Sequence, residues 1–159
     1  MPGPIVTAML PGSRPGLSSI LERVLLATDL TEASEAATEI ALGLARKLEA
    51  SLLVVSVIEP GRGGGRGQRV DQVRDRQEHA AQGLVGRGRE LGIPVSFLIW
   101  VGDPGEQIVS AAESEHADLV VVGTRGRGAM GRLFIGSVSD YVVRHAPCPV
   151  VVVRPLEAA

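Results

Sequence analysis

Apolar and polar positions change their period several times along the chain. Some short stretches are apolar almost without interruption, which is typical of buried strands. The strands predicted in this way are residues 23–28, 52–58, 95–101, 119–122 and 150–153. The stretches between them repeat apolar residues every three or four positions, which is typical of one face of a helix. We therefore predict four helices that end near Leu48, Leu91, His116 and His145.

Capping chemistry predicts where two of these helices begin. Thr31 and Ser34 are candidate N-caps of the first helix, because a hydroxyl oxygen can accept a hydrogen bond from a free amide there. Asp103 followed by Pro104 is typical of an N-cap and a first-turn proline, so the third helix is expected to start at this pair.

The order of these elements predicts the fold. Strands that alternate with helices favour a parallel sheet. The run Leu-Val-Val-Val at residues 119–122 has no inside-outside alternation, so this strand is expected to be buried on both faces. Right-handed crossovers then place helices on both faces. We predict a doubly wound, five-stranded parallel α/β domain over residues 21–159, preceded by a flexible tail over residues 1–20.

Composition and charge exclude several classes of function. The 16 basic and 18 acidic residues give a net charge of −2, and aromatic residues make up only 3% of the chain. A nucleic-acid surface needs a basic patch or stacking aromatics, so we expect no nucleic-acid partner. No run approaches the roughly 18 apolar residues of a membrane span. Residues 1–20 lack the basic start and the apolar stretch that are typical of a signal peptide. With Cys148 as its one cysteine, the protein is expected to be cytoplasmic and to have no membrane partner.

Candidate ligand-binding residues follow two of the predicted strands. Ligands of open parallel sheets bind at the carboxyl ends of strands. Asp29 follows the first strand, and a glycine-rich stretch, 123–137, follows the fourth. A P-loop would need a lysine in this stretch, and the chain's one lysine is Lys47. Gly126, Gly128 and Gly131 spell Gly-x-Gly-x-x-Gly, but a dinucleotide fingerprint belongs at the first turn of the sheet with an acid about 20 residues later.

A third spacing in this stretch is more specific. Gly123-x2-Gly126-x9-Gly136-Ser137 resembles the ATP-binding signature of the universal stress proteins. The resemblance extends from about Val24 to Val153. It includes Ala-Thr-Asp at the end of the first strand and Ser-Val-Ser-Asp-Tyr-Val-Val-Arg-His-Ala-Pro-Cys-Pro-Val after the loop. It implies the sheet order 3-2-1-4-5, in which Asp29 and Gly123 face each other across one crevice.

The resemblance also implies the composition of an ATP site. Asp29 would accept hydrogen bonds from the ribose, and the backbone of Val57 would pair with adenine. Gly123 and Gly126 would tolerate positive φ and expose amide groups, and the helix start at Gly136 and Ser137 would favour phosphate. The complete predicted set is Ala27, Thr28, Asp29, Val57, Val122, Gly123, Arg125, Gly126, Arg127, Gly136, Ser137 and Val138.

Structural roles for the same residues remain open at this stage. Asp29 could cap the first helix, and Ser137 could form a capping box with Asp140. Ala27, Thr28 and Val122 could be ordinary strand core. Arg125 and Arg127 could neutralise phosphate or be solvated.

Three functions are compatible with these residues. The first is a protein that holds and senses ATP, with Mg²⁺ as a candidate companion ion. The second is a slow ATPase, and the third is a nucleotide-free interaction protein. Phosphoryl transfer needs an oriented nucleophile and positioned cations, and the sequence identifies neither, so no catalytic or metal-ligating residue is assigned. The fifth strand, Val150–Val153, is expected to be an edge strand that pairs with a second copy, as the resemblance also implies.

Overall fold

The chain folds into alternating strands and helices. The computed structural model describes residues 20–61, 68–124 and 136–155. Its elements are β1 (Arg23–Ala27), the 3₁₀ helix η2 (Glu32–Ser34), α1 (Glu35–Leu48), β2 (Ser51–Ile58), α2 (Gln68–Leu91), β3 (Val95–Val101), α3 (Pro104–Ser114), β4 (Leu119–Gly123), α4 (Ser137–His145) and β5 (Val150–Val153). The predicted strands are confirmed to within one residue at each end. The predicted N-terminal tail lies outside the described residues, except for Ile20.

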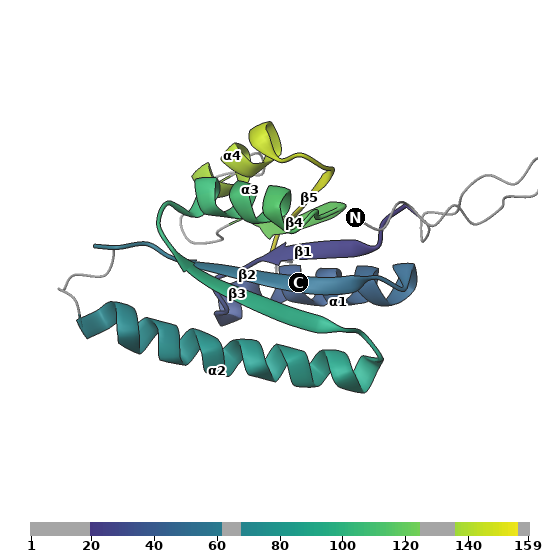
Figure 1. The fold of residues 1–159 in the computed structure, drawn as a ribbon, viewed down its shortest axis with the longest axis horizontal. Helices are drawn as coiled ribbons and strands as arrows, with labels where there is room; N and C mark the ends of the chain where they lie inside the picture. The colour runs from purple at the N-terminus through teal and green to yellow at the C-terminus, as the bar shows by residue number, and fades with distance from the viewer. Residues whose placement is uncertain (1–19, 62–67, 125–135, 156–159) are drawn as a thin grey trace, which may run out of the picture.

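The strands form one parallel sheet in the order β3-β2-β1-β4-β5. Figure 1 shows α1 and α2 on one face of this sheet and α3 and α4 on the other. The predicted doubly wound α/β fold and its strand order are therefore confirmed. β1 lies between β2 and β4, so the direction of winding reverses between β1 and β4. A crevice at the carboxyl ends of strands is expected at such a reversal.

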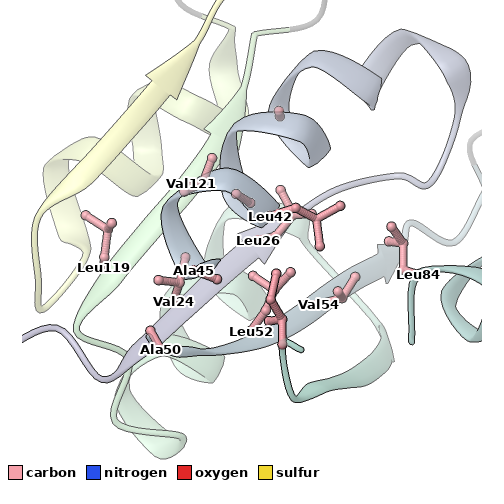
Figure 2. Packing of buried hydrophobic residues seen from close by; sticks show 13 residues of the cluster. Val24, Leu26, Leu42, Ala45, Ala50, Leu52, Val54, Leu84, Leu119 and Val121 are labelled. Atoms are coloured by element: carbon pink, nitrogen blue, oxygen red, sulfur yellow. The ribbon is translucent and has the colours of Figure 1, made fainter. Parts of the chain in front are cut away.

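Burial on both faces explains why the strands are apolar throughout. Leu26 of β1 packs with Leu42 of α1 and Leu84 of α2, as Figure 2 shows for this cluster. The preceding residue, Leu25, lies on the other face of the sheet and packs with Ile108 of α3. Both leucines are 0% exposed. Each strand therefore contributes to two cores, and a strand with one polar face would leave polar groups in one of them.

α1, α2 and α3 end with the same backbone turn. Glu49, Gly92 and His116 follow these helices in the left-handed region, with φ of 54°, 73° and 54°. The next residue in each case donates its amide to the carbonyl oxygen five positions earlier, at 2.8–2.9 Å. This geometry satisfies the last helical carbonyls. It also leads the chain directly into β2, β3 and β4.

Glycine at the two non-glycine positions of this turn is expected to stabilise the fold. A residue with a Cβ loses about 1 kcal/mol in the left-handed region, and the side chains of Glu49 and His116 are exposed. Glu49→Gly and His116→Gly should each raise the free energy of unfolding by about 0.5–1 kcal/mol. Urea denaturation measures this change. Gly92→Ala is the matched control and should lower stability; stabilisation by that variant would contradict the explanation.

None of the helices in the described part of the chain combines the length and apolarity needed to cross a membrane.

Candidate functional site

A cavity of about 730 Å³ lies at the carboxyl ends of β1, β2 and β4. It occupies the point where the winding of the sheet reverses. Its wall consists of Ala27, Thr28, Asp29, Thr31, Glu32, Ala33, Ser34, Val55, Val57, Pro104, Ile108, Val122, Gly123, Thr124, Gly136, Ser137, Val138 and Ser139. Every predicted site residue that the structure describes is in this wall. Arg125, Gly126 and Arg127 lie outside the described residues.

One part of the wall is apolar. Val55 and Val57 of β2, Ile108 of α3 and Val138 of α4 contribute side chains to it. Val55 is fully buried, whereas Val57 is only half-buried. Such a surface can pack against a flat, weakly polar ring, while strand backbone offers hydrogen-bonding groups at its edge.

Asp29 lies at the polar side of the cavity and accepts several hydrogen bonds. Its Oδ1 accepts from the amide of Thr31 at 3.0 Å, from Thr31 Oγ1 at 2.7 Å and from Ser34 Oγ at 2.9 Å. Asp29 therefore organises the turn after β1 and does not cap a helix through these contacts. Hydrogen bonds of this kind fix the direction of a carboxylate.

The prediction that Thr31 and Ser34 are N-caps is confirmed for their positions but wrong for the capping hydrogen bonds. Each occupies an N-cap position, Thr31 before η2 and Ser34 before α1, but neither side chain makes a capping hydrogen bond. Their hydroxyls donate to Asp29, and the Ser34 hydroxyl also lies 2.8 Å from the Thr31 carbonyl oxygen. A carboxylate is a stronger acceptor than a backbone carbonyl and offers a hydroxyl a better partner. The prediction for Asp103 is confirmed, since its side chain accepts from the amide of Glu106 at 3.1 Å.

The first turn of α4 borders the cavity without a side-chain cap. Gly136 occupies the N-cap position, and Ser137 is the first helical residue. The predicted capping box of Ser137 with Asp140 is absent, because Ser137 lies one position too far along the helix. The Asp140 carboxylate instead pairs with Arg144, Nε to Oδ2, at 3.1 Å. A helix N-terminus that opens into a cavity favours an anion, since its free amides and dipole are positive.

Gly123 does not need the conformational freedom of glycine that the sequence suggested. It is the last residue of β4, and its φ is outside the left-handed region. A Cβ added there would lie 3.4 Å from the Cβ of Ala37, on the α1 side of the sheet. Gly123 therefore does not use the positive φ that glycine would tolerate. A strand residue keeps the extended backbone that its pairing with Val153 requires.

Sequence reasoning missed part of the wall. The sequence predicts Thr31 and Ser34 as N-caps, and the structure places both in the wall beside Asp29. Pro104 and Ile108 come from α3, and only the crossover of the fold brings that helix over the ends of β1 and β2. Spacing along the chain carries no signal for such a contact.

Titratable groups give little indication of catalysis. Within the described residues no group of three His, Cys, Asp or Glu side chains could hold a metal ion. Burial raises the pKa of the Cys148 thiol, and the negative charge of Asp118 adds to this effect. A raised pKa disfavours the reactive thiolate, so Cys148 is not an activated nucleophile.

Comparisons with known proteins agree with this architecture. The model of the universal stress protein family matches residues 21–154. A universal stress protein of Thermus aquaticus, from the QAH/OAS sulfhydrylase 3′ region, is 39% identical over 137 residues, which cover 85% of this chain and 100% of that protein.

Solved structures show the same fold. A universal stress protein in complex with cAMP has a TM-score of 0.67 at 24% identity, over 84% of this chain and 97% of that chain. A universal stress protein family protein from Arabidopsis thaliana, solved with AMP bound, has a TM-score of 0.65 at 22% identity, over 86% of this chain and 93% of that chain. The match to the family model and the 39% identity with the relative from Thermus aquaticus show that the chain belongs to the universal stress protein family.

Proposed function

We propose that this protein binds ATP in the cavity between β1 and β4 and holds it as a signal of stress or energy state. The observation that carries the proposal is the combination of three surfaces around one space of about 730 Å³. They are an apolar wall, a hydrogen-bonded carboxylate and the uncapped start of α4. A nucleotide has three parts of matching chemistry: a base, a ribose and phosphates.

Each part of the nucleotide has a favoured position. The base would lie against Val55 and Val57, where strand backbone can pair with its edge. The ribose hydroxyls would donate to Asp29. The phosphates would lie at Gly136 and Ser137, because the α4 terminus attracts anions. Arg125 and Arg127, together with amides near Gly126, would neutralise further phosphate charge.

Adenine as the base is supported by the relatives solved with cAMP and with AMP bound. Mg²⁺ would enter with the phosphates, since no group of three metal-ligating side chains occurs among the described residues. Mg²⁺ is commonly held in this way, by phosphates and water with few protein ligands.

Holding ATP is favoured over hydrolysing it. The acidic residues of the described cavity wall are Asp29 and Glu32. One oxygen of Asp29 already accepts hydrogen bonds from Thr31 and Ser34 within the turn after β1, which fixes the carboxylate as a binding group. Phosphoryl transfer needs positioned cations, and the described wall contains no lysine or arginine.

Nucleotide binding can be tested directly. The purified protein would be denatured and its released nucleotides separated by chromatography, and calorimetry would measure the affinity of the emptied protein for ATP. We expect ATP to bind. Asp29→Asn should weaken ATP binding by about tenfold or more, because the ribose hydroxyls would then donate to a neutral amide oxygen in place of a charged carboxylate. Steady release of phosphate in a timed assay would favour the slow ATPase. A protein that binds no adenine nucleotide would contradict the proposal and favour an interaction protein.

We further propose a cytoplasmic homodimer that pairs through β5. β5 is an edge strand, and it consists of four half-buried valines. The carbonyls of Pro149 and Val153 accept hydrogen bonds from the amides of Val120 and Thr124. The amides of the alternate residues, such as Val152, therefore point to the open edge. A bare apolar edge favours pairing with another chain. The cytoplasm supplies ATP and keeps Cys148 reduced.

Val152→Pro should convert the dimer into a monomer. Proline removes the amide at the open edge but leaves the bonds to β4 intact, and edge strands tolerate proline at such positions. Light scattering coupled to size exclusion at micromolar concentration would measure the mass. Circular dichroism would control for folding. A monomeric wild-type protein, or a folded variant that remains dimeric, would contradict pairing through β5.

A further inference from the structure

The turn after β1 holds the carboxylate of Asp29 more firmly than a site on a mobile loop would. Oδ1 of Asp29 receives two donors from Thr31, its amide at 3.0 Å and its hydroxyl at 2.7 Å. The hydroxyl of Ser34 lies 2.9 Å from the same Oδ1 and 2.8 Å from the Thr31 carbonyl oxygen, so its one hydrogen is shared between these two acceptors. Thr28 Oγ1 in turn donates to Ser34 Oγ at 2.8 Å. Ser34, which stands at the N-cap position of α1, thus connects Asp29 to Thr28 at the end of β1.

We propose that Thr31 and Ser34 are positioning residues that determine how strictly the site selects a ribose over a deoxyribose. This inference rests on the proposed function, because it assigns Asp29 to the sugar. It concerns two residues of the cavity wall, Thr31 and Ser34, whose role is to orient the carboxylate of Asp29.

The backbone of the turn supports this role. Leu30, directly after Asp29, has a φ of 61°, a strained value for a residue with a branched side chain. Its side chain packs against the core cluster on the α1 face. Its amide donates to Thr28 Oγ1 at 3.0 Å, and the amide of Thr28 donates to Val55 at 3.0 Å. Strain of this kind persists where surrounding contacts over-determine the conformation, and it gathers at ligand clamps.

A fixed carboxylate has a specific consequence for selectivity. When a site is built to accept a hydroxyl, an analogue without that hydroxyl leaves a polar group unpaired and binds poorly. A carboxylate that can turn finds water as an alternative partner, so the penalty on the analogue falls. Losing the donors from Thr31 or Ser34 should therefore reduce selectivity for the sugar more than it reduces affinity for the phosphates.

The experiment compares the affinities of ATP, 2′-deoxyATP and 3′-deoxyATP by calorimetry. The wild-type protein should prefer ATP over at least one deoxy analogue by about tenfold or more. Ser34→Ala and Thr31→Val should each reduce that ratio to about threefold or less. Thr31→Ser keeps the hydroxyl and should retain the ratio. Ser114→Ala is the matched control, since its hydroxyl donates to a carbonyl within α3, that of Ala111.

A double-mutant cycle separates positioning from direct contact with the ligand. In an Asp29→Asn background, Ser34→Ala should have no further effect on the ratio if Ser34 acts through Asp29. A further loss there would mean that Ser34 contacts the sugar itself and would overturn the inference. Circular dichroism establishes whether each variant is folded. If Ser34→Ala does not fold, Thr31→Val tests in its place whether a hydroxyl beside Asp29 affects sugar selectivity through that carboxylate.

Three other results have distinct meanings. If the wild-type protein binds no ATP, the proposed function fails and the inference fails with it. If it binds ATP without selecting the sugar, the inference alone is overturned. If Ser34→Ala and Thr31→Val weaken all three nucleotides equally, the two hydroxyls are merely structural and the inference is again overturned.

Discussion

Replacing Ser137 with aspartate is expected to weaken ATP binding by about 10- to 100-fold while making the folded protein slightly more stable. Ser137 is the exposed first residue of α4, and its side chain lines the cavity. A carboxylate there interacts favourably with the helix dipole, by about 0.3–1 kcal/mol. It would also place a negative charge where the proposed site holds phosphate. Stability and binding should therefore change in opposite directions.

The phosphate dependence of this effect provides its control. Adenosine carries no phosphate, so its affinity should be nearly unchanged in Ser137→Asp, whereas affinities for AMP, ADP and ATP should fall progressively. Ser137→Asn has nearly the same shape without the charge and should bind ATP within a few-fold of the wild-type protein. Calorimetry measures the affinities and thermal denaturation measures the stability. If Ser137→Asp bound ATP as tightly as the wild-type protein, the start of α4 would not be the phosphate site.

The fold could be predicted from the sequence because its signals are local and repeated. Leu119–Gly123 is apolar at nearly every position, and Val120 and Val121, which face opposite cores, are both 0% exposed. That pattern is compatible with a central parallel strand and little else. The position of the site follows from the fold, since a parallel sheet brings Asp29 and Gly123 to one edge.

The chemistry within the site was harder to predict, because it depends on competition between partners. Thr31 and Ser34 have the residue types of N-caps, yet their hydroxyls donate to Asp29, a charged acceptor two and five positions earlier. The left-handed φ of Leu30 is also invisible in the sequence. Leucine has no preference for that region, and its packing against the core together with the hydrogen bond from its amide to Thr28 Oγ1 holds it there. Such choices are decided by tertiary contacts, which spacing and propensity do not encode.

Glycines of α2 provide the strongest contrast in expected stability. By helix propensity alone, Gly83, Gly86 and Gly88 would each weaken this helix. The structure separates them. No atom lies within 4 Å of a Cβ added at Gly83 or Gly86, whereas a Cβ at Gly88 would lie 2.2 Å from Val95 Cγ2 and 2.9 Å from the Ile93 carbonyl oxygen. Gly88 lets the last part of α2 approach the start of β3.

Gly88→Val is therefore expected to lower the free energy of unfolding by about 2–3 kcal/mol through overpacking. Rotation of the Val95 side chain can relieve one of the two clashes. The Ile93 carbonyl cannot rotate away in this manner, because it belongs to the backbone and the amide of Ile93 donates to the Gly88 carbonyl oxygen at 2.8 Å. Gly86→Val is the matched control on the same helix and should change stability by less than about 0.5 kcal/mol. Gly83→Ala and Gly86→Ala should each raise the free energy of unfolding by about 0.5–1 kcal/mol.

Urea denaturation measures the free energy of unfolding of the four α2 variants. The affinity of each variant for ATP tests whether the substitution also affects the cavity. α2 packs on the face of the sheet opposite α3 and α4, and Gly88 lies near the amino end of β3, away from the cavity. Gly88→Val should therefore bind ATP normally at temperatures where it remains folded. A variant as stable as the wild-type protein would show that α2 can move away from β3 at little cost. A stable variant with impaired ATP binding would instead show that this packing is coupled to the site across the sheet.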